Sequence, residues 1–182
     1  MRYLFLLASG RLNGNSELLA RYAAQHLPED ASAVFLRLSD YPLPYFKDYR
    51  RGDYGGLVPT DNERKLIDET LLADVLVMVS PLYWYSLAAS AKLYLDYWST
   101  WMRLPGLNFR DACKGKRVFG ICAMAGTDSA EARPLEEQIR LSANYMAMDY
   151  RRTLVVQANE AGDVLDDEDA LGAAARLFTD GQ

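Results

Sequence analysis

The sequence is poor in the side chains on which hydrolytic, thiol and metal chemistry usually depend. It has one histidine and two cysteines in 182 residues. His26 stands beside Leu27 and Pro28, at the end of an expected helix, so a histidine-based triad or a histidine-ligated metal site has little support. Cys113 and Cys122 are not spaced as C-x-x-C. We therefore expect two reduced thiols without a redox role, and no metal site.

The chain also lacks long apolar runs and an excess of positive charge. No run approaches the ~20 residues of a membrane-spanning helix, and no basic leader precedes an apolar stretch and a cleavage site. We expect a cytoplasmic protein that does not bind a membrane. With 25 acidic and 20 basic side chains the formal net charge is -5. This charge repels a phosphate backbone, so nucleic acid is not an expected partner.

What the sequence does have is the composition and length of one folded domain. Half of its residues are hydrophobic and a quarter are charged, which is typical of globular proteins. A chain of 182 residues is long enough for one buried core and short for two. We therefore expect residues 1–182 to form a single domain.

Short apolar runs alternate along the chain with segments of helical periodicity. Strands are expected at 3–8, 34–38, 75–79, 117–123 and 153–157, and helices at 18–27, 62–72, 87–102, 131–148 and 165–178. This alternation predicts an α/β three-layer sandwich, in which a five-stranded parallel sheet carries helices on both faces. The strand order 2-1-3-4-5 satisfies right-handed crossovers and predicts ligand binding outside the carboxyl ends of the first and third strands.

The loop after the first strand reads S-G-R-L-N-G-N-S and opens a helix. A helix N-terminus attracts anions, the side chains of Ser9, Asn13, Asn15 and Ser16 offer hydrogen bonds, and Arg11 offers a positive charge. The loop has neither the terminal lysine of a nucleoside triphosphate loop nor the spacing G-x-G-x-x-G. It therefore predicts a site for a single phosphate. The alternative is a polar turn in which Asn15 or Ser16 only caps the helix.

The loop after the third strand reads S-P-L-Y-W-Y-S, from Ser80 to Ser86. Three consecutive aromatic side chains, Tyr83, Trp84 and Tyr85, follow a buried strand at the point where ligands bind. Aromatic rings stack on a flat ring system, and the backbone of the turn offers N–H groups to its edge. The pattern favours a wall for a flat ligand. The alternative places these rings in the core or in a subunit contact.

A third connection, residues 39–61, is longer than the ~12 to 15 residues of an ordinary loop. Its aromatic and basic side chains are Tyr41, Tyr45, Phe46, Tyr49 and Tyr54, with Arg50 and Arg51. This composition indicates a lid or a partner surface, and the alternative is a poorly ordered insertion.

The expected helix at 87–102 carries more apolar side chains than contact with one sheet requires. One stripe holds Leu87, Ala91, Tyr94, Leu95, Trp98 and Met102, and Tyr97 and Trp101 fall beside it. The surplus indicates a subunit interface. The alternative is a core helix that other elements cover.

Two of these motifs carry a resemblance to a known family. The S-x-R-x-N-x-N-S loop that opens a helix, and S-P-L-Y-W-Y-S followed by L-A-A-S-A-K-L-Y-L-D-Y, resemble the NAD(P)H-dependent FMN reductase family of flavodoxin-like proteins. The resemblance covers residues 2–124. It implies a flavodoxin-like domain that binds one FMN.

The resemblance also implies roles for individual residues. The FMN phosphate would lie among Ser9, Arg11, Asn13, Asn15 and Ser16, the isoalloxazine ring along Pro81, Leu82, Tyr83, Trp84, Tyr85 and Ser86, and the other side of the ring at Ala125, Gly126 and Thr127. Tyr85 stands where the family commonly has glycine. Its side chain therefore either stacks over the ring or points toward a second subunit.

The function implied is that of a homodimeric enzyme which passes hydride from NADPH or NADH through FMN to a small-molecule acceptor, namely a quinone, flavin, nitro or azo compound. Flavin chemistry of this kind needs position and electrostatics from the protein, and no acid or base residue is expected to be catalytic. The alternatives are a flavodoxin-type electron carrier and a flavin-free interaction domain of the same fold. A net charge of only -5 and the long aromatic loop favour the enzyme.

Overall fold

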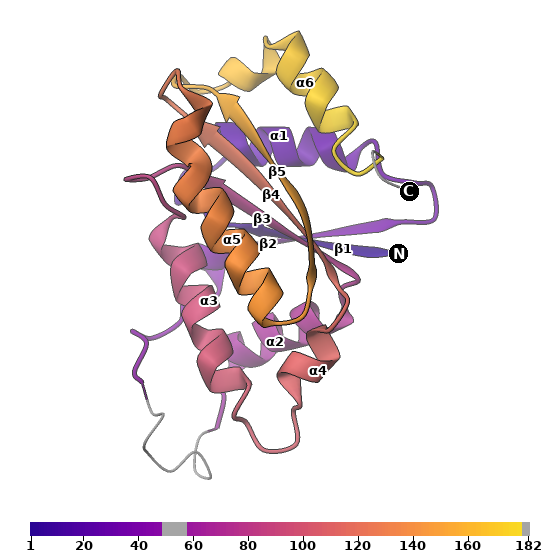
Figure 1. Cartoon of the computed structure of the whole chain (residues 1–182), viewed down its shortest axis with the longest axis vertical. Helices are drawn as coiled ribbons and strands as arrows, with labels where there is room; N and C mark the ends of the chain where they lie inside the picture. Colours follow the sequence, from indigo (N-terminus) through magenta and orange to yellow (C-terminus); the bar gives the residue numbers. More distant parts are fainter. Residues whose placement is uncertain (49–57, 180–182) are drawn as a thin grey trace.

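The computed structural model describes residues 1–48 and 58–179, and Figure 1 shows its elements. One parallel sheet has the order β2-β1-β3-β4-β5, which confirms the predicted order. Its strands are β1 Arg2–Leu7, β2 Ser32–Arg37, β3 Val75–Pro81, β4 Arg117–Met124 and β5 Asp149–Gln157. This is the flavodoxin-like order, whose direction of winding reverses at β1 and β3.

Helices cover both faces of the sheet, which confirms the three layers (Figure 1). One face carries α1 Asn15–Ala24 and α6 Glu168–Ala175, and the other carries α2 Asp61–Leu72, α3 Ala89–Trp101, α4 Phe109–Cys113 and α5 Arg133–Tyr145. Short 3-10 turns are η1 Leu38–Asp40, η2 Ser129–Ala132 and η3 Asp163–Leu165.

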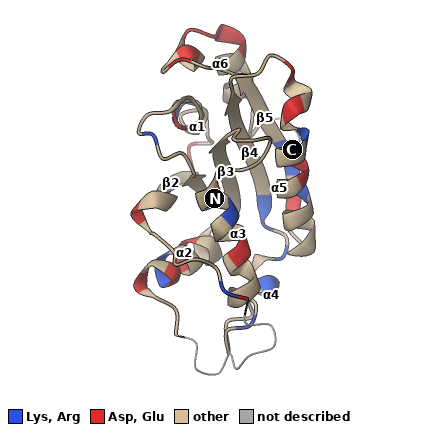
Figure 2. Cartoon of the chain, turned by 90° about the vertical axis from the view of Figure 1, so that its left-hand side faces the viewer, with Lys and Arg blue, Asp and Glu red and all other residues tan. Residues whose placement is uncertain are grey.

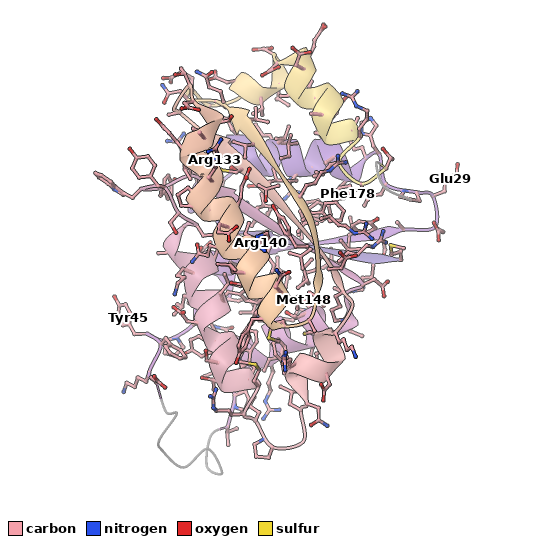
Figure 3. The ribbon with its side chains drawn as sticks, in the orientation of Figure 1. Glu29, Tyr45, Arg133, Arg140, Met148 and Phe178 are labelled. Atoms are coloured by element: carbon pink, nitrogen blue, oxygen red, sulfur yellow. The ribbon has the colours of Figure 1, made fainter. Side chains whose placement is uncertain are left out.

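The core forms on both sides of the sheet because successive strand residues point to opposite faces. In β1, Leu4 and Leu6 face the α2 and α3 side, whereas Phe5 and Leu7 face α1 and α6. Beyond α6, Phe178 closes this second side (Figure 3), and its ring centre lies 5.1 Å from that of Phe119. A sheet buried on both faces leaves its strand ends as the places where polar side chains gather.

Several predicted boundaries are wrong by a few residues. The strand β5 begins at Asp149 and not at 153, because an edge strand accepts the polar residues that conceal it in the sequence. Helix α1 ends at Ala24 and not at 27. The last predicted helix, 165–178, is a short turn, η3, followed by α6.

The aromatic side chains of α3 lie inside the chain and not on its surface. Tyr94 and Trp101 are fully buried, and Trp98 is 6 % exposed. The ring of Phe109, from the unpredicted helix α4, lies 5.4 Å from that of Trp101, and Thr70 shares a 2.6 Å hydrogen bond with the Tyr94 hydroxyl. The core-helix alternative is therefore right. The rings of this helix are covered within the chain, by Thr70 of α2, Phe109 of α4 and Phe46, so they give no support to a subunit interface.

The long connection between β2 and α2 is described only in part. Tyr41 and Phe46 pack against the core, whereas Tyr45 is 94 % exposed and points away from the fold (Figure 3). Tyr49, Arg50, Arg51 and Tyr54 are outside the described residues. The prediction of a lid or partner surface therefore stays a prediction.

Membrane-spanning helices, metal sites and reactive thiols can each be assessed among the described residues. Between 1 and 48 and between 58 and 179, no helix is long and apolar enough to span a bilayer, and no cluster of three or more His, Cys, Asp or Glu side chains could hold a metal ion. Cys113 and Cys122 are buried free thiols. Burial raises the pKa of Cys113 to about 11 and that of Cys122 to about 12, which keeps both protonated.

We predict that Phe109→Ala lowers the free energy of unfolding by about 3 to 5 kcal/mol, because it opens a cavity beside Trp101. Tyr45→Ala, at an exposed ring, is the matched control and should change stability little. Chemical denaturation of both variants measures the difference. Equal effects would contradict the buried aromatic cluster.

Candidate functional site

A cavity of about 220 Å³ opens at the carboxyl edge of the sheet, where the predicted phosphate loop meets the ends of β3, β4 and β5. Its lining residues are Ser9, Arg11, Gly14, Asn15, Ser16, Pro81, Leu82, Tyr83, Ala123, Met124, Ala125, Ala158 and Asn159. A larger hollow of about 390 Å³ lies between α2 and the loop 104–107. We place the site in the smaller cavity because several carboxyl ends of strands and a helix N-terminus converge there.

The cavity brings together many, but not all, of the predicted site residues. Ser9, Arg11, Asn15, Ser16, Pro81, Leu82, Tyr83 and Ala125 line it. Asn13, Trp84, Tyr85, Ser86, Gly126 and Thr127 do not. The lining residues missed from the sequence are Gly14, Ala123, Met124, Ala158 and Asn159. Ala158 and Asn159 follow β5, and their position after an expected strand was the signal that could have found them.

The N-terminus of α1 faces the cavity without a capping side chain. Gly14 is the N-cap and no side-chain hydrogen bond caps the helix, so the alternative interpretation, a turn in which Asn15 or Ser16 only caps the helix, is wrong. The first amides of the helix therefore remain available to an anion. A Cβ on residue 14 would lie 3.3 Å from Ser9 Oγ, which is tighter than usual. Glycine at this position lets the loop fold closely over the helix end.

Asn15 and Ser16 do not cap α1 because their side chains bind other strand ends. The Asn15 amide donates to the Glu160 carbonyl at 2.7 Å and accepts from the Gly162 N–H at 2.9 Å. The Ser16 hydroxyl oxygen accepts from the Ala123 N–H at 3.3 Å. These bonds tie the loop after β1 to β4 and to the loop after β5. They hold the walls of the cavity in register.

Arg11 is the positively charged residue among those that line the cavity, and it is exposed to solvent. Acidic residues, coloured red in Figure 2, cluster at the start of α6, where Glu168 and Asp169 occupy the first turn and Asp167 caps the helix. The loop that precedes α6 is bonded to Asn15. Attraction of an anion to this edge therefore depends on Arg11 and on the α1 N-terminus.

A buried carboxylate beside the loop after β1 is the centre of an ion-pair network. Glu17, in the first turn of α1, is 1 % exposed and binds two arginines. Its Oε2 accepts from Arg37 Nη2 at 2.6 Å, and its Oε1 accepts from Arg21 Nη2 at 2.8 Å. Burial by itself would raise the pKa of Glu17, but hydrogen bonds from Arg37 and Arg21 and their charges hold it below its ordinary value. The carboxyl is therefore ionised at neutral pH.

The aromatic residues after β3 form a tight turn with unusual backbone angles. Tyr83 and Ser86 exchange two backbone hydrogen bonds of 3.2 and 3.1 Å. Between them Trp84 has φ 49° and Tyr85 has φ 62°, which is the left-handed region that glycine adopts most readily. This explains why glycine is common at the place of Tyr85 in the family that the sequence resembles.

The rings of this turn point largely into solvent within one chain. Tyr83, Trp84 and Tyr85 are 53 %, 92 % and 54 % exposed. The Ser86 hydroxyl donates to Gln138 Oε1 at 3.0 Å, which attaches the turn to α5. Tyr83 reaches the cavity, and Trp84 and Tyr85 extend beyond it. The core placement of these rings is therefore wrong, and a wall for a ligand or a subunit contact remains.

A family model and a known relative both relate this chain to FMN-dependent oxidoreductases. The family model described as NADPH-dependent FMN reductase matches residues 1–162. A Bacillus subtilis protein named as an NAD(P)H-dependent FMN-containing oxidoreductase, YwqN, is 28 % identical over 179 residues, which are 98 % of this chain and 97 % of that protein. The resemblance found in the sequence is thereby confirmed.

Solved structures share the fold over the whole chain. The Trp repressor binding protein from Bacillus subtilis superimposes with a TM-score of 0.77 at 24 % identity, and the match covers 100 % of both chains. An FMN-dependent NADH-azoreductase from Bacillus anthracis, solved in complex with FMN, has a TM-score of 0.65 at 17 % identity and covers 97 % of this chain and 99 % of that one. At these identities the likeness shows the fold.

The network beside the loop predicts how stability depends on pH. Because folding lowers the pKa of Glu17 from 4.5, its contribution is complete above that value and is lost as the pH falls through the lowered pKa. We predict that Glu17→Gln loses less stability than the wild type between about pH 6 and pH 3. Urea denaturation across this range measures the slope. Equal slopes for the two proteins would contradict the ionised pair.

Proposed function

The chain belongs to the NADPH-dependent FMN reductase family, and on that premise we propose that it binds FMN in the carboxyl-edge cavity and passes hydride from NADPH or NADH to a small-molecule acceptor. The observation that carries this placement is the meeting of an uncapped helix N-terminus, a cation and an aromatic turn around one cavity. Such a combination suits a ligand with a phosphate at one end and a flat ring at the other.

The phosphate end of the cofactor fits the loop after β1. The first amides of α1 lack a capping side chain, Ser9 and Arg11 line the same cavity, and Gly14 leaves room that a Cβ would take. Asn13 donates its backbone N–H to Glu17 and lies outside the cavity, so its role is to shape the loop. Asn15 and Ser16 connect the loop to neighbouring strand ends, and we assign the first contacts with phosphate to Arg11 and the helix amides.

The ring end of the cofactor fits between the turn after β3 and the loop after β4. Pro81, Leu82 and Tyr83 line the cavity from the end of β3, and Ala125 lines it from the end of the neighbouring strand β4. At about 220 Å³ the cavity is smaller than the ~300 to 1,000 Å³ of enclosed ligand pockets. We infer that the ring lies partly outside it, along the exposed Tyr83, Trp84 and Tyr85 and the half-buried Ser86, and beside Gly126 and Thr127.

Bound FMN supplies the chemistry, because it accepts hydride from a reduced nicotinamide and donates electrons to an acceptor. The protein binds, orients and shields it. Among the described residues that line the cavity, the titratable side chains are Arg11 and Tyr83. We therefore assign no acid or base catalyst, and the main contribution of the chain is to position two flat rings in turn at an open face.

The openness of that face supports the proposed acceptor class. Quinone, flavin, nitro and azo compounds are flat or extended, and three largely exposed aromatic rings border the place where they would stack. A soluble electron carrier needs a docking surface for protein partners and no nicotinamide site. A flavin-free interaction domain needs no phosphate loop. The cation and the uncapped helix end favour a flavin-binding protein over the interaction domain, and membership of the reductase family favours the enzyme over the carrier.

One experiment separates these functions. The purified protein is examined for visible flavin absorbance, its cofactor is released and identified, and NADPH and NADH are tested with quinone, azo, nitro and free-flavin acceptors. We expect FMN and multiple turnovers with at least one acceptor. Bound FMN without steady-state turnover would identify a carrier, and failure to bind added FMN would identify an interaction domain.

We also propose a homodimer in which the turn of Trp84 and Tyr85 meets the second subunit near the flavin. The support is exposure, since these rings are 92 % and 54 % exposed in one chain, and large exposed aromatic side chains are enriched at interfaces. The buried aromatics of α3 give no support to this contact. Light scattering over a range of concentrations measures the mass, and a constant monomer mass would refute the dimer.

We predict that Arg11→Ala weakens FMN binding by about 1.5 to 3 kcal/mol, because it removes a charged hydrogen-bond donor for the phosphate. Arg64→Ala, at an exposed arginine of α2, is the matched control and should leave affinity unchanged. Flavin fluorescence titration measures both. An unchanged dissociation constant in Arg11→Ala would refute the phosphate assignment.

We predict that Tyr85→Gly relieves the left-handed backbone at φ 62° and opens the face beside the ring. If Tyr85 borders the acceptor, bulky acceptors gain turnover relative to small quinones, and FMN affinity changes by no more than ~0.5 to 1.5 kcal/mol. If it lies in the dimer contact, subunit dissociation increases and the acceptor ranking stays. Acceptor profiles and analytical ultracentrifugation distinguish the two. No change in either would mean that the turn lies at neither surface.

A further inference from the structure

The loop after β1, residues 9–13, is held by a side chain from strand β2. Arg37 is the last residue of β2, and its side chain is 12 % exposed. Its Nη1 donates to the carbonyls of Ser9 and Arg11, each at 3.4 Å, and its Nη2 donates to Glu17 at 2.6 Å. One guanidinium therefore connects β2, the loop and α1. A planar donor with several N–H groups is suited to such a junction.

Glu17 holds the loop at a further point. The same Oε2 that binds Arg37 also accepts the backbone N–H of Asn13 at 3.1 Å. Asn13 has φ 53°, a left-handed conformation that a non-glycine residue adopts at a cost. The hydrogen bond to Glu17 offsets that cost. The backbone of residues 9–13 is thus tied to the network through two carbonyls and one N–H group.

The chemistry of this network favours a role in binding over a role in stability alone. Burying an ion pair carries a desolvation penalty that often cancels its attraction, so such a pair is weak evidence for stability. A buried carboxylate close to an anion site also repels the anion. Arg21 and Arg37 compensate that charge. What an anion site gains from Glu17 and Arg37 is therefore their hydrogen bonds to the loop backbone.

We propose that Glu17 and Arg37 are positioning residues, which fix the loop 9–13 in the shape that receives phosphate and so determine the preference for FMN over riboflavin. This inference rests on the proposed function. Neither residue lines the cavity, and they act through the loop. Their removal should therefore weaken binding of the phosphate end and leave binding of the ring largely unchanged.

A second network at the opposite edge of the sheet provides a matched control. Glu69 of α2 is 7 % exposed and, like Glu17, binds an arginine from a strand and a cation one helical turn away, here Arg2 and Lys65. The pKa of its carboxyl is also lowered: burial opposes ionisation, and hydrogen bonds from Lys65 and Arg2 outweigh it. Glu69→Gln therefore repeats the loss of a buried ionised carboxylate at a place remote from the loop.

The test compares FMN and riboflavin affinities in Glu17→Gln, Arg37→Lys and Glu69→Gln. Arg37→Lys keeps the charge but cannot reach Glu17 and two carbonyls together. We expect the ratio of riboflavin to FMN dissociation constants to fall about ten-fold in the first two variants and to stay constant in Glu69→Gln. Simple electrostatics predicts the opposite sign for Glu17→Gln, since removing a negative charge attracts phosphate.

A second readout needs no flavin. In the ligand-free protein, amide hydrogen exchange at residues 10–14 should be faster in Glu17→Gln and Arg37→Lys than in the wild type, and unchanged in Glu69→Gln. A wild-type preference for FMN that both loop variants retain would overturn the positioning role and leave the proposed function standing. A wild type that binds no FMN would overturn both.

Discussion

The carboxylate of Glu17 is the group on which the shape of the candidate site depends. It lies in the first turn of α1, is 1 % exposed, and accepts hydrogen bonds from two arginines and from the backbone of the loop after β1. Because a buried charge must be fully paired, the positions of Arg37 at the end of β2 and of the loop after β1 are both set by it. Ser16, the preceding residue, bonds to Ala123 on β4. One turn of helix therefore places two strand ends around the cavity.

The turn after β3 has the opposite character. It is held by backbone bonds between Tyr83 and Ser86, and the two residues between them adopt positive φ without being glycine. Strain of this kind persists where surrounding contacts impose it, and it tends to occur at functional sites. Its rings are exposed, so neither burial nor packing in one chain accounts for them. A ligand or a second subunit is the partner that would account for both the strain and the exposure.

The aromatic stripe of α3 shows why an apolar surplus is ambiguous in a sequence. Periodicity shows that Tyr94, Trp98 and Trp101 fall on neighbouring faces of one helix, but it does not say what covers them. Part of the cover is Phe109 from α4, a helix of five residues that is too short to produce a periodic pattern. The exposed aromatics lie instead in a turn, where no helical or strand period exists. The surplus of apolar side chains on this helix correctly indicated that they are buried, but it did not indicate which elements bury them.

The sequence by itself determined the fold, the strand order and the two loops that meet at the candidate site, because alternation of apolar runs, loop composition and the rules of strand connection are local or nearly local properties. It also identified eight of the residues that line the cavity. The tertiary structure decided the rest. Asn15 binds Glu160, 145 positions away, and Arg37, at the end of β2, binds Glu17 of α1. Ala158 and Asn159 join the wall only because β5 ends beside β4. These contacts depend on which residues lie close together in the folded chain, and the spacing of residues in the sequence does not give that information.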